Sequence, residues 1–382
     1  MEYLITDTRT GVAERDFWLD NSALPADFPV AFDCRHQTLR GGKQEGSELI
    51  TLNVGALSVA VSPSRGMGVL YAQQDDLRLG WDSPVKEVVN PSFIELSKHN
   101  GLGWLEGFNE LVARCGYQWS GHPGMDGDEM LTLHGQIQNI PASVVRLTVE
   151  DTPPYRVRLS GRVDERCFKK VEFEVWTHLV ITPGKARFTL EDELINRGSY
   201  PKEYQALYHN NFGAPILEEG AQVRVPASQV SPFNARAVEG LASWASMPAP
   251  TAGFDEEVFN IRPIGDSEGD TLTLLHNAAA DRGVAMGFNL RQLPVLTLWK
   301  NCDTPEQGYV VGLEPGTSFA YNRRYQRDLG LVPTIGAGES RNFVVNFDLL
   351  LDAQAVANAE AKVELLQGES ELELRAEPLV TL

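Results

Sequence analysis

The segment KVEFEVWTHLVI at residues 170–181 constrains the fold more than any other part of the chain. Apolar side chains recur at every second position from Val171 to Ile181, which is the repeat of a strand with one buried face. A second strand pattern, at residues 186–196, follows directly after the turn TPGK. The two segments are therefore predicted to pair as an antiparallel hairpin.

Strand patterns fill most of the chain beyond residue 50, whereas helical patterns are sparse. The other predicted strands are 51–61, 143–150, 155–163, 271–277, 283–289, 295–301, 309–315 and 342–351. The alanine-rich segment 353–367 has the strongest helix pattern, and residues 93–116 are predicted to hold one or two short helices broken by glycines.

A chain of 382 residues exceeds the usual size of a single core, so it forms either two domains or one very large β-structure. The composition shows no break between residues 50 and 350, which favours one large antiparallel β-sandwich. The fold class is therefore predicted as dominated by β-structure with a few short helices. We expect residues 1–45 to be peripheral, 46–352 to form the domain, and 353–382 to pack on it as a helix and tail.

The charge of the chain limits its partners. Lys and Arg number 33 against 52 Asp and Glu, a formal net charge of −19. Such a chain is a poor binder of nucleic acid or of an anionic membrane, because its charge repels phosphate. The N-terminal segment lacks the pattern of a signal peptide, and no run of about 18 apolar residues predicts a membrane span. Four scattered cysteines fit reduced thiols in a cytoplasmic protein.

Several residues stand in settings that suit acid–base chemistry. Glu314 follows a strand pattern and precedes Pro-Gly-Thr, where the backbone holds a carboxylate in place, as a general base requires. His209 lies in LYHNNFG, His134 in TLHGQIQN, and His122 in a loop rich in glycine and proline. The same patterns are also typical of residues without a catalytic role, namely an exposed glutamate at the end of a strand and a buried, hydrogen-bonded histidine. His134, His209 and Glu314 also fit a metal site, which their separations neither support nor exclude.

The sequence lacks the motifs of several enzyme classes. It contains no GxSxG elbow, no Walker loop, no GxGxxG between a strand and a helix, and no HExxH. Aromatic residues are frequent near the polar segments, and aromatic faces beside amides and acids suit sugars, although many of these rings also suit a core. These aromatic residues are Trp104, Phe108, Trp119, Tyr208, Phe212, Trp299, Phe319 and Tyr321.

An ordered set of motifs resembles one known family. These motifs are SRGMG (64–68), GLGWLEGFNELVARCG (101–116), LHGQIQNIPA (133–142), LEDELINRG (190–198), LYHNNFGAP (207–215) and VGLEPGT (311–317). Together they resemble the bacterial DUF4432-type branch of the aldose 1-epimerase (galactose mutarotase-like) superfamily, over roughly residues 50–350. The resemblance implies a β-supersandwich with an open sugar cleft, a glutamate base, a histidine acid, and no cofactor or metal.

The resemblance also implies roles for individual residues. Glu314 takes the place of the base and His209 that of the acid, while His134 takes that of the sugar-binding histidine in the LHG motif. Arg114 is the candidate for a sugar-binding arginine, with Arg65 in SRGMG as its alternative.

Three further residues are candidates for contacts with the sugar. Asp255 is the candidate for an acidic contact to hydroxyl groups, and Asn210 and Asn211 are expected to orient the loop or to bind hydroxyls. Relatives in this branch are associated with deoxyribose or other catabolic sugars, so the resemblance does not define the sugar.

We therefore expect a cytoplasmic aldose 1-epimerase that interconverts the α and β anomers of a free sugar, as a monomer or a homodimer. A non-catalytic sugar-binding or sensor protein is the first alternative. A glycoside hydrolase or lyase is the second, with Asp255 or Glu257 as its second carboxylate. A metal enzyme is the third. The basic cluster Arg323, Arg324 and Arg327 is interpreted as a solvated face.

Overall fold

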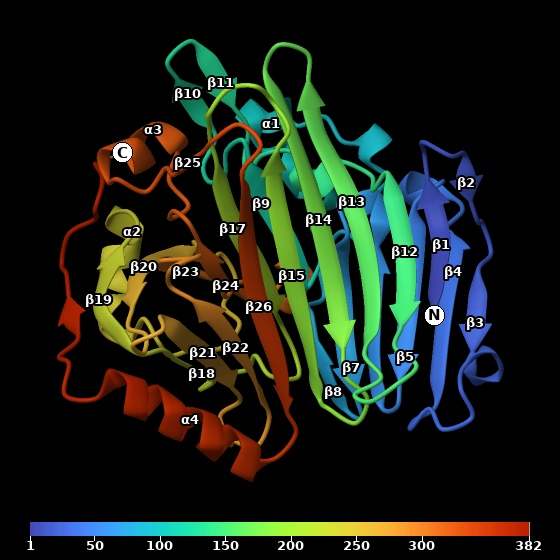
Figure 1. The fold of residues 1–382 in the computed structure, drawn as a ribbon. Coiled ribbons are helices and arrows are strands. Elements are labelled where there is room, and N and C mark those ends of the chain that lie inside the picture. The colour runs from blue at the N-terminus through green and yellow to red at the C-terminus, as the bar shows by residue number, and fades with distance from the viewer. Residues whose placement is uncertain (382) are drawn as a thin grey trace.

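Two large sheets packed face to face make up the computed structural model, which describes residues 1–381 (Figure 1). Strands in both sheets are antiparallel, apart from the short β27, which runs parallel to β19. The ten-stranded sheet has the order β18 (Gln222–Arg224), β21 (Asp270–His276), β22 (Gly283–Asn289), β26 (Ser340–Leu350), β15 (Arg187–Asn196), β14 (Val171–Ile181), β13 (Val157–Cys167), β12 (Val144–Val149), β1 (Glu2–Asp7) and β2 (Val12–Ala13).

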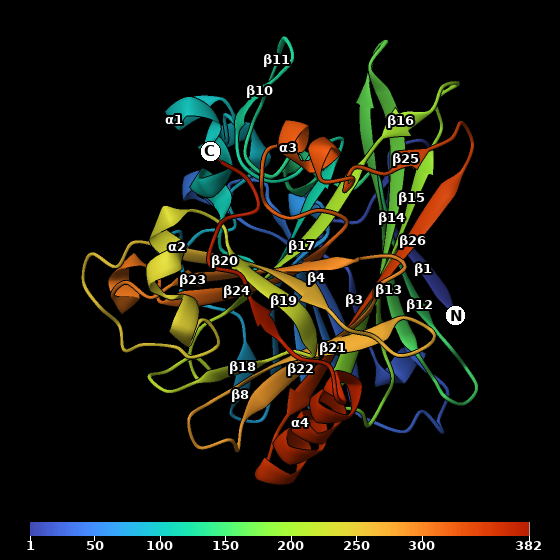
Figure 2. The same cartoon turned by 90° about the vertical axis from the view of Figure 1, so that its left-hand side faces the viewer.

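The second sheet carries the candidate site. Its thirteen strands are β27 (Glu373–Leu374), β19 (Ala227–Pro232), β20 (Glu257–Pro263), β23 (Val295–Asn301), β24 (Val310–Gly316), β17 (Gln205–Phe212), β9 (Val112–Tyr117), β7 (Gly68–Gln74), β6 (Leu57–Ser62), β5 (Glu48–Val54), β4 (Phe32–Thr38) and β3 (Trp18–Asp20), with β8 (Leu77–Leu79) beside β7. Figure 2 shows β14, β15 and β26 on one side of the molecule and β23 and β24 on the other.

Short elements surround the two sheets. Two small ladders pair β10 (Gly124–Asp126) with β11 (Glu129–Leu131) and β16 (Lys202–Glu203) with β25 (Thr334–Ile335). The α-helices are α1 (Lys98–Gly101), α2 (Ala235–Glu239), α3 (Arg323–Asp328) and α4 (Ala353–Gln367). The 3₁₀ turns are η1 (Asn21–Ala23), η2 (Gly42–Gln44), η3 (Pro63–Arg65), η4 (Pro91–Phe93), η5 (Gly103–Gly107), η6 (Ile137–Asn139), η7 (Leu241–Ser243) and η8 (Pro305–Gln307).

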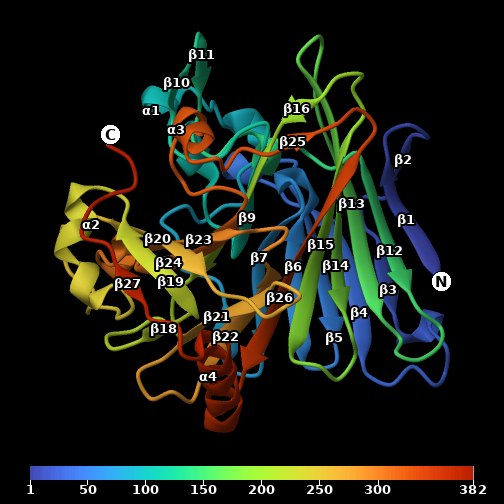
Figure 3. The same ribbon diagram turned by 60° about the vertical axis from the view of Figure 1, so that its left-hand side comes forward.

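The predicted fold class is confirmed. Strands β14 and β15 pair as the expected hairpin, with Val175 opposite Leu194 and Leu179 opposite Leu190. Helix α4 covers the predicted segment, and the side chain of Asp352 caps it by accepting a hydrogen bond from the backbone N–H of Ala355 at 2.8 Å. In Figure 3, α4 lies at the foot of the molecule, next to β21 and β22.

Residues 93–116 are less helical than their pattern indicates. Only α1 and η5 form there, and the last part of the segment is strand β9. The reason is tertiary, because Val112–Tyr117 fills the position between β7 and β17 in the larger sheet.

The first 45 residues contribute to both sheets. Strands β1 and β2 end the ten-stranded sheet, and β3 and β4 end the thirteen-stranded sheet. After α4 the chain returns to add β27 beside β19. The division into 1–45, 46–352 and 353–382 stays a prediction.

No helix within residues 1–381 is both long and apolar enough to cross a membrane. The cysteines Cys34, Cys115, Cys167 and Cys302 are all free thiols.

Candidate active site

Side chains along β17 point alternately into two environments, the core between the sheets and the opposite face of the sheet. Tyr208 points between the sheets, where its hydroxyl reaches Asp192 of β15, and His209 points to the opposite face. On the neighbouring β24, Leu313 joins the core between the sheets, so Glu314 shares the face of His209. The pairing of Asn210 with Leu313 and of Asn211 with Gly312 sets the register that places His209 directly across from Glu314.

A cavity of about 240 Å³ opens over this part of the sheet. That volume is slightly below the ~300–1,000 Å³ of pockets for drug-sized ligands, so it suits a monosaccharide-sized molecule. Its walls combine aromatic and aliphatic side chains with three histidines and two glutamates. The lining residues are Leu102, Trp104, Leu105, Phe108, His122, Leu133, His134, His209, Phe233, Glu256, Val258, Thr297, Trp299, Glu314 and Ala320.

His209 and Glu314 form a close pair on the floor of the cavity. Nε2 of His209 lies 3.1 Å from Oε1 of Glu314, yet that oxygen makes no hydrogen bond within residues 1–381. The two atoms are close enough for a hydrogen bond, but the angle between the groups is not that of one. The two groups therefore lie side by side. Both side chains therefore keep a polar atom for a ligand.

Asn211 holds the other side of the imidazole. Its Oδ1 lies 2.7 Å from Nδ1 of His209, and its Nδ2 donates to the backbone carbonyls of Glu110 and His209. These contacts set the orientation of the amide. Among the expected sugar ligands, Asn211 thus acts on the site through His209.

Burial acts on the acid–base groups in opposite directions. It lowers the pKa of His209 to about 4, and it raises the pKa of Glu314 well above its usual value. The pKa of His134 is also held well below its usual value by burial and by its histidine neighbours. Such a cluster of shifted pKa values inside a cavity is typical of functional sites.

Glycine and aromatic residues shape the space around the pair. A Cβ atom on Gly312 would lie 2.7 Å from Oε1 of Glu314, so a larger residue at this point of the VGLEPGT motif would displace that carboxyl group. The ring of His134 packs edge-on to His209 and to Trp104, and Trp299 lies edge-on to His209. The structure thus brings His134, His209 and Glu314 to one cavity.

Arg114, expected to bind sugar, does not reach this cavity. On β9 it shares the inter-sheet face with Tyr208, and its Nη1 donates to Thr177 of β14 at 2.9 Å. The same Nη1 lies 3.6 Å from Oδ1 of Asp192. The side chain is on the wrong face of the strand to contact a ligand beside His209.

Arg65, the alternative arginine, lies in a second buried network behind the site. It donates to the Glu110 carboxylate at 2.9 Å, to the carbonyl of Gly107 and to Asn139. A Cβ on Gly107 would lie 2.6 Å from Nη2 of Arg65, so a larger residue here would displace the guanidinium group. Arg65 therefore supports the segment that presents Trp104 and Phe108 to the cavity.

Two other expected ligands also lie elsewhere. Asn210 points away from the cavity and donates to the carbonyls of Tyr208 and Leu313. Asp255 is exposed and does not line the cavity, whereas its neighbour Glu256 does. Oε2 of Glu256 accepts a hydrogen bond from Trp299 Nε1 at 2.7 Å.

Sequence reasoning missed Glu256, Thr297 and Phe233 as lining residues. Thr297 lies directly opposite Glu314 on β23, and its hydroxyl has no hydrogen-bond partner among the described residues. The strand pattern of 295–301 was a usable signal, since residues 295, 297 and 299 share one face. The pattern does not show which face of this strand lies against the cavity.

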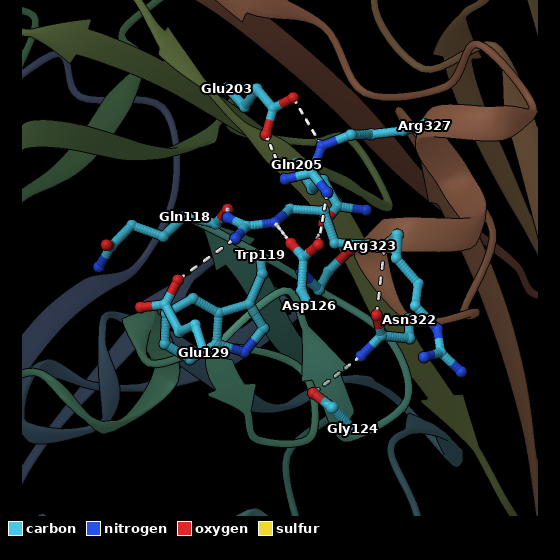
Figure 4. Close-up of polar contacts among 12 residues, drawn as sticks. Gln118, Trp119, Gly124, Asp126, Glu129, Glu203, Gln205, Asn322, Arg323 and Arg327 are labelled. Carbon is cyan, nitrogen blue, oxygen red and sulfur yellow. Dashed lines mark hydrogen bonds and ion pairs between the residues drawn. The ribbon is translucent and has the colours of Figure 1, made fainter.

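The basic cluster near α3 is an ion-pair network (Figure 4). Arg323 and Arg327 both pair with Asp126 of β10, and Arg327 also pairs with Glu203 of β16. The side chain of Arg323 is only 13% exposed. The interpretation of a solvated face is therefore wrong for Arg323, whereas Arg327 is exposed, and the charges of both tie the β10–β11 hairpin to α3.

The volume of a cavity alone does not identify the candidate site. A larger groove of about 710 Å³ lies between α4 and the outer face of the ten-stranded sheet, and none of its described lining residues is a histidine.

No group of three or more His, Cys, Asp or Glu side chains in the described part of the chain is placed to hold a metal ion.

The fold defines a mutarotase-like class of protein, and comparisons with known proteins agree. A crystal structure from Klebsiella pneumoniae subsp. pneumoniae, provisionally named an aldose 1-epimerase, is 44% identical over 100% of both chains, with a TM-score of 0.97. A galactose mutarotase-like protein from Clostridium acetobutylicum is 14% identical, with a TM-score of 0.56, over 83% of this chain and 98% of its own.

A galactose 1-epimerase from Lactobacillus acidophilus is 13% identical, with a TM-score of 0.52, over 84% of this chain and 99% of its own. At such identities the last two likenesses show the fold alone. No match was found among curated proteins. The model of the DUF4432 family, a domain of unknown function, matches residues 44–349, and the chain belongs to that family.

Proposed function

We propose that this protein is an aldose 1-epimerase that interconverts the α and β anomers of a free sugar. The single observation that carries the proposal is the pair of His209 and Glu314, 3.1 Å apart on the floor of a cavity of monosaccharide size. The likeness to the Klebsiella protein supports the same reaction class.

The reaction needs one acid and one base beside the same carbon atom. Opening the ring removes a proton from the C1 hydroxyl and adds one to the ring oxygen, and rotation about C1–C2 followed by closure gives the other anomer. Two groups on adjacent strands serve both oxygens, which are bonded to that one carbon. Each positioned group contributes on the order of 10²–10⁴-fold.

The walls of the cavity fit a sugar without a phosphate group. Among the described lining residues none is Lys or Arg, and Glu256 and Glu314 supply only acidic groups. A phosphate would meet no cation there. Trp104, Phe108 and Trp299 offer aromatic surface to the C–H faces of the ring.

NMR exchange spectroscopy on reducing sugars tests the proposal, with galactose, glucose, fucose, 2-deoxyribose and a hexose 6-phosphate as the panel. We expect protein-dependent exchange between the anomeric signals of at least one neutral sugar. Glu314→Gln and His209→Asn should each lower the rate constant roughly 10²–10⁴-fold while the protein stays folded. Full activity in either variant removes that residue from the mechanism.

A sugar-binding or sensor protein on the same fold makes a different prediction. Line broadening of sugar signals without exchange, unchanged in Glu314→Gln, would favour that alternative.

A further inference from the structure

One buried hydroxyl group at the floor of the cavity has no role in the proposed acid–base step. Thr297 is fully buried on β23 and lines the cavity, and its Oγ1 has no hydrogen-bond partner among residues 1–381. A buried polar group without a partner lowers the stability of a folded protein, and valine would fill the same shape without that cost. The hydroxyl of Thr297 therefore suits a ligand that completes its hydrogen bonds.

The strand register places Thr297 in one row with the proposed acid and base. Thr297 is the cross-strand partner of Glu314 on β24. The pairing of Asn210 with Leu313 puts His209 across from Glu314 on β17. Neighbouring strands lie about 4.8 Å apart, so the side chains of His209, Glu314 and Thr297 follow one another along a single line on the cavity face.

The same row is rich in hydrogen-bond acceptors. Asn260 of β20 lies opposite Thr297 on its other side, and its Nδ2 donates to the hydroxyl of Tyr321 at 3.0 Å. Oδ1 of Asn260 and Oε1 of Glu314 have no hydrogen-bond partner in the described chain. A threonine hydroxyl has a single hydrogen to donate, so this row of oxygens lacks donors. The hydroxyl groups of a sugar are donors as well as acceptors.

The order of the row assigns a particular hydroxyl group of the sugar to Thr297. Carbon C1 of an aldose is bonded to the ring oxygen, to its own hydroxyl oxygen and to C2. With the ring oxygen at His209 and the C1 hydroxyl at Glu314, the next substituent along the row is the one on C2. This assignment rests on the proposed mutarotation, which sets the two oxygens of C1 against His209 and Glu314.

We propose that Thr297 is a specificity-determining residue that binds the hydroxyl group on C2 of the sugar. The two hydroxyl groups pair directly, since each can donate and accept. The substrates are then aldoses that carry a hydroxyl group on C2. A 2-deoxy sugar leaves the buried hydroxyl of Thr297 unpaired, and a site of this kind discriminates against it.

Matched pairs of sugars test the proposal. Anomer exchange is measured with glucose and 2-deoxyglucose, galactose and 2-deoxygalactose, and ribose and 2-deoxyribose, and each rate constant is divided by that of the spontaneous reaction of the same sugar. In the pair on which the protein is most active, we expect kcat/KM of the 2-hydroxy member to be roughly 10-fold higher. Equal values, or a higher value for the 2-deoxy member, overturn the proposal.

Thr297→Val keeps the shape of the side chain and removes its hydroxyl. We expect this variant to lower kcat/KM of the 2-hydroxy member roughly 10-fold and to leave that of the 2-deoxy member unchanged, while Thr297→Ser retains the wild-type preference. Its melting temperature should equal or exceed that of the wild-type protein, because no hydrogen bond within the described chain is lost. A lower melting temperature with an unchanged preference shows a structural role and overturns the proposal.

Thr271→Val is the matched control in the other sheet. Thr271 is buried on β21, and its hydroxyl donates to the carbonyl of Ile264 at 2.7 Å. This variant loses a hydrogen bond within the protein, so it should lower the melting temperature and leave the preference between the two sugars unchanged. The same change of preference in both variants overturns the assignment of the C2 contact to Thr297.

The outcomes separate this proposal from the proposed function. If no sugar shows anomer exchange, saturation-transfer NMR of the same pairs measures binding alone. Binding that favours the 2-hydroxy member, and that loses this preference in Thr297→Val, ends the mutarotase function and retains the contact. Anomer exchange at equal kcat/KM for both members ends the contact and retains the mutarotase function.

Discussion

Strand β17 has two faces, and each carries a buried cluster of ionisable groups. On the inter-sheet face, Asp192 accepts hydrogen bonds from Tyr117 at 3.0 Å and Tyr208 at 2.8 Å, and Arg114 lies 3.6 Å away. On the cavity face, Oε1 of Glu314 has no hydrogen-bond partner in the described structure, and the described lining contains no Lys or Arg. Donors and a cation stabilise the charged form of a buried carboxylate, whereas burial without them raises the pKa, as it does for Glu314.

Substituting Arg114 gives the largest expected effect. Arg114→Met removes the cation beside Asp192 and leaves a buried charge uncompensated, so we expect a loss of about 3–5 kcal/mol in the free energy of unfolding. Urea unfolding measures that loss. The KM of the folded variant for its sugar should not change, because Arg114 lies on the far side of the sheet. A raised KM with normal stability would return Arg114 to the role of sugar ligand.

The variant Glu314→Gln tests the comparison through the pH dependence of thermal stability. The folded-state pKa of Glu314 is raised, so its stabilising contribution is complete below about pH 4.5 and is lost as the pH rises toward the folded-state value. Glutamine stays neutral and avoids this loss. The melting temperature of the variant minus that of the wild-type protein should therefore increase by a few degrees between about pH 4 and 8.

The lowered pKa of His209, about 4, affects both proteins alike and cancels in this difference. Thermal unfolding followed by circular dichroism at matched ionic strength measures the difference. A constant difference across this pH range would show that Glu314 is an ordinary carboxylate in the folded protein.

The smallest expected effect distinguishes two neighbouring carboxylates at the mouth of the cavity. Glu256 lines the cavity and Asp255 does not, so Glu256→Gln should raise KM roughly 2- to 10-fold, the effect of one weakened hydrogen bond. The matched variant Asp255→Asn should leave KM unchanged. Titration of the anomer exchange rate against sugar concentration measures both, and the opposite result would restore Asp255 as the acidic contact.

Much of the fold was predictable because its signals are local. The alternation in 170–181 and the turn TPGK predicted the β14–β15 hairpin, and the alanine-rich segment predicted α4. Strand β9 was not predicted within 93–116, because its place between β7 and β17 depends on pairings with distant segments. Local pattern carries no information about such partners.

The candidate site was predictable in part. His209, His134 and Glu314 were placed through motifs, and the structure brings all three to one cavity. Arg65 and Arg114 stand in the same motifs but support the structure from behind the cavity. A motif records that a residue is needed and does not distinguish a ligand from a buried support.

The sequence by itself determined the strands, their alternation and the residue types available for acid–base chemistry, because backbone geometry and side-chain period are local properties. Only the tertiary structure decided which face of each strand meets the other sheet and which meets the cavity. That choice sets Tyr208 against Asp192 and His209 beside Glu314, 105 positions apart in the chain and adjacent in the sheet. Pairing over such a separation depends on the packing of the whole β-sandwich, and the packing also decides which buried carboxyl group is opposed by a cation and which is not.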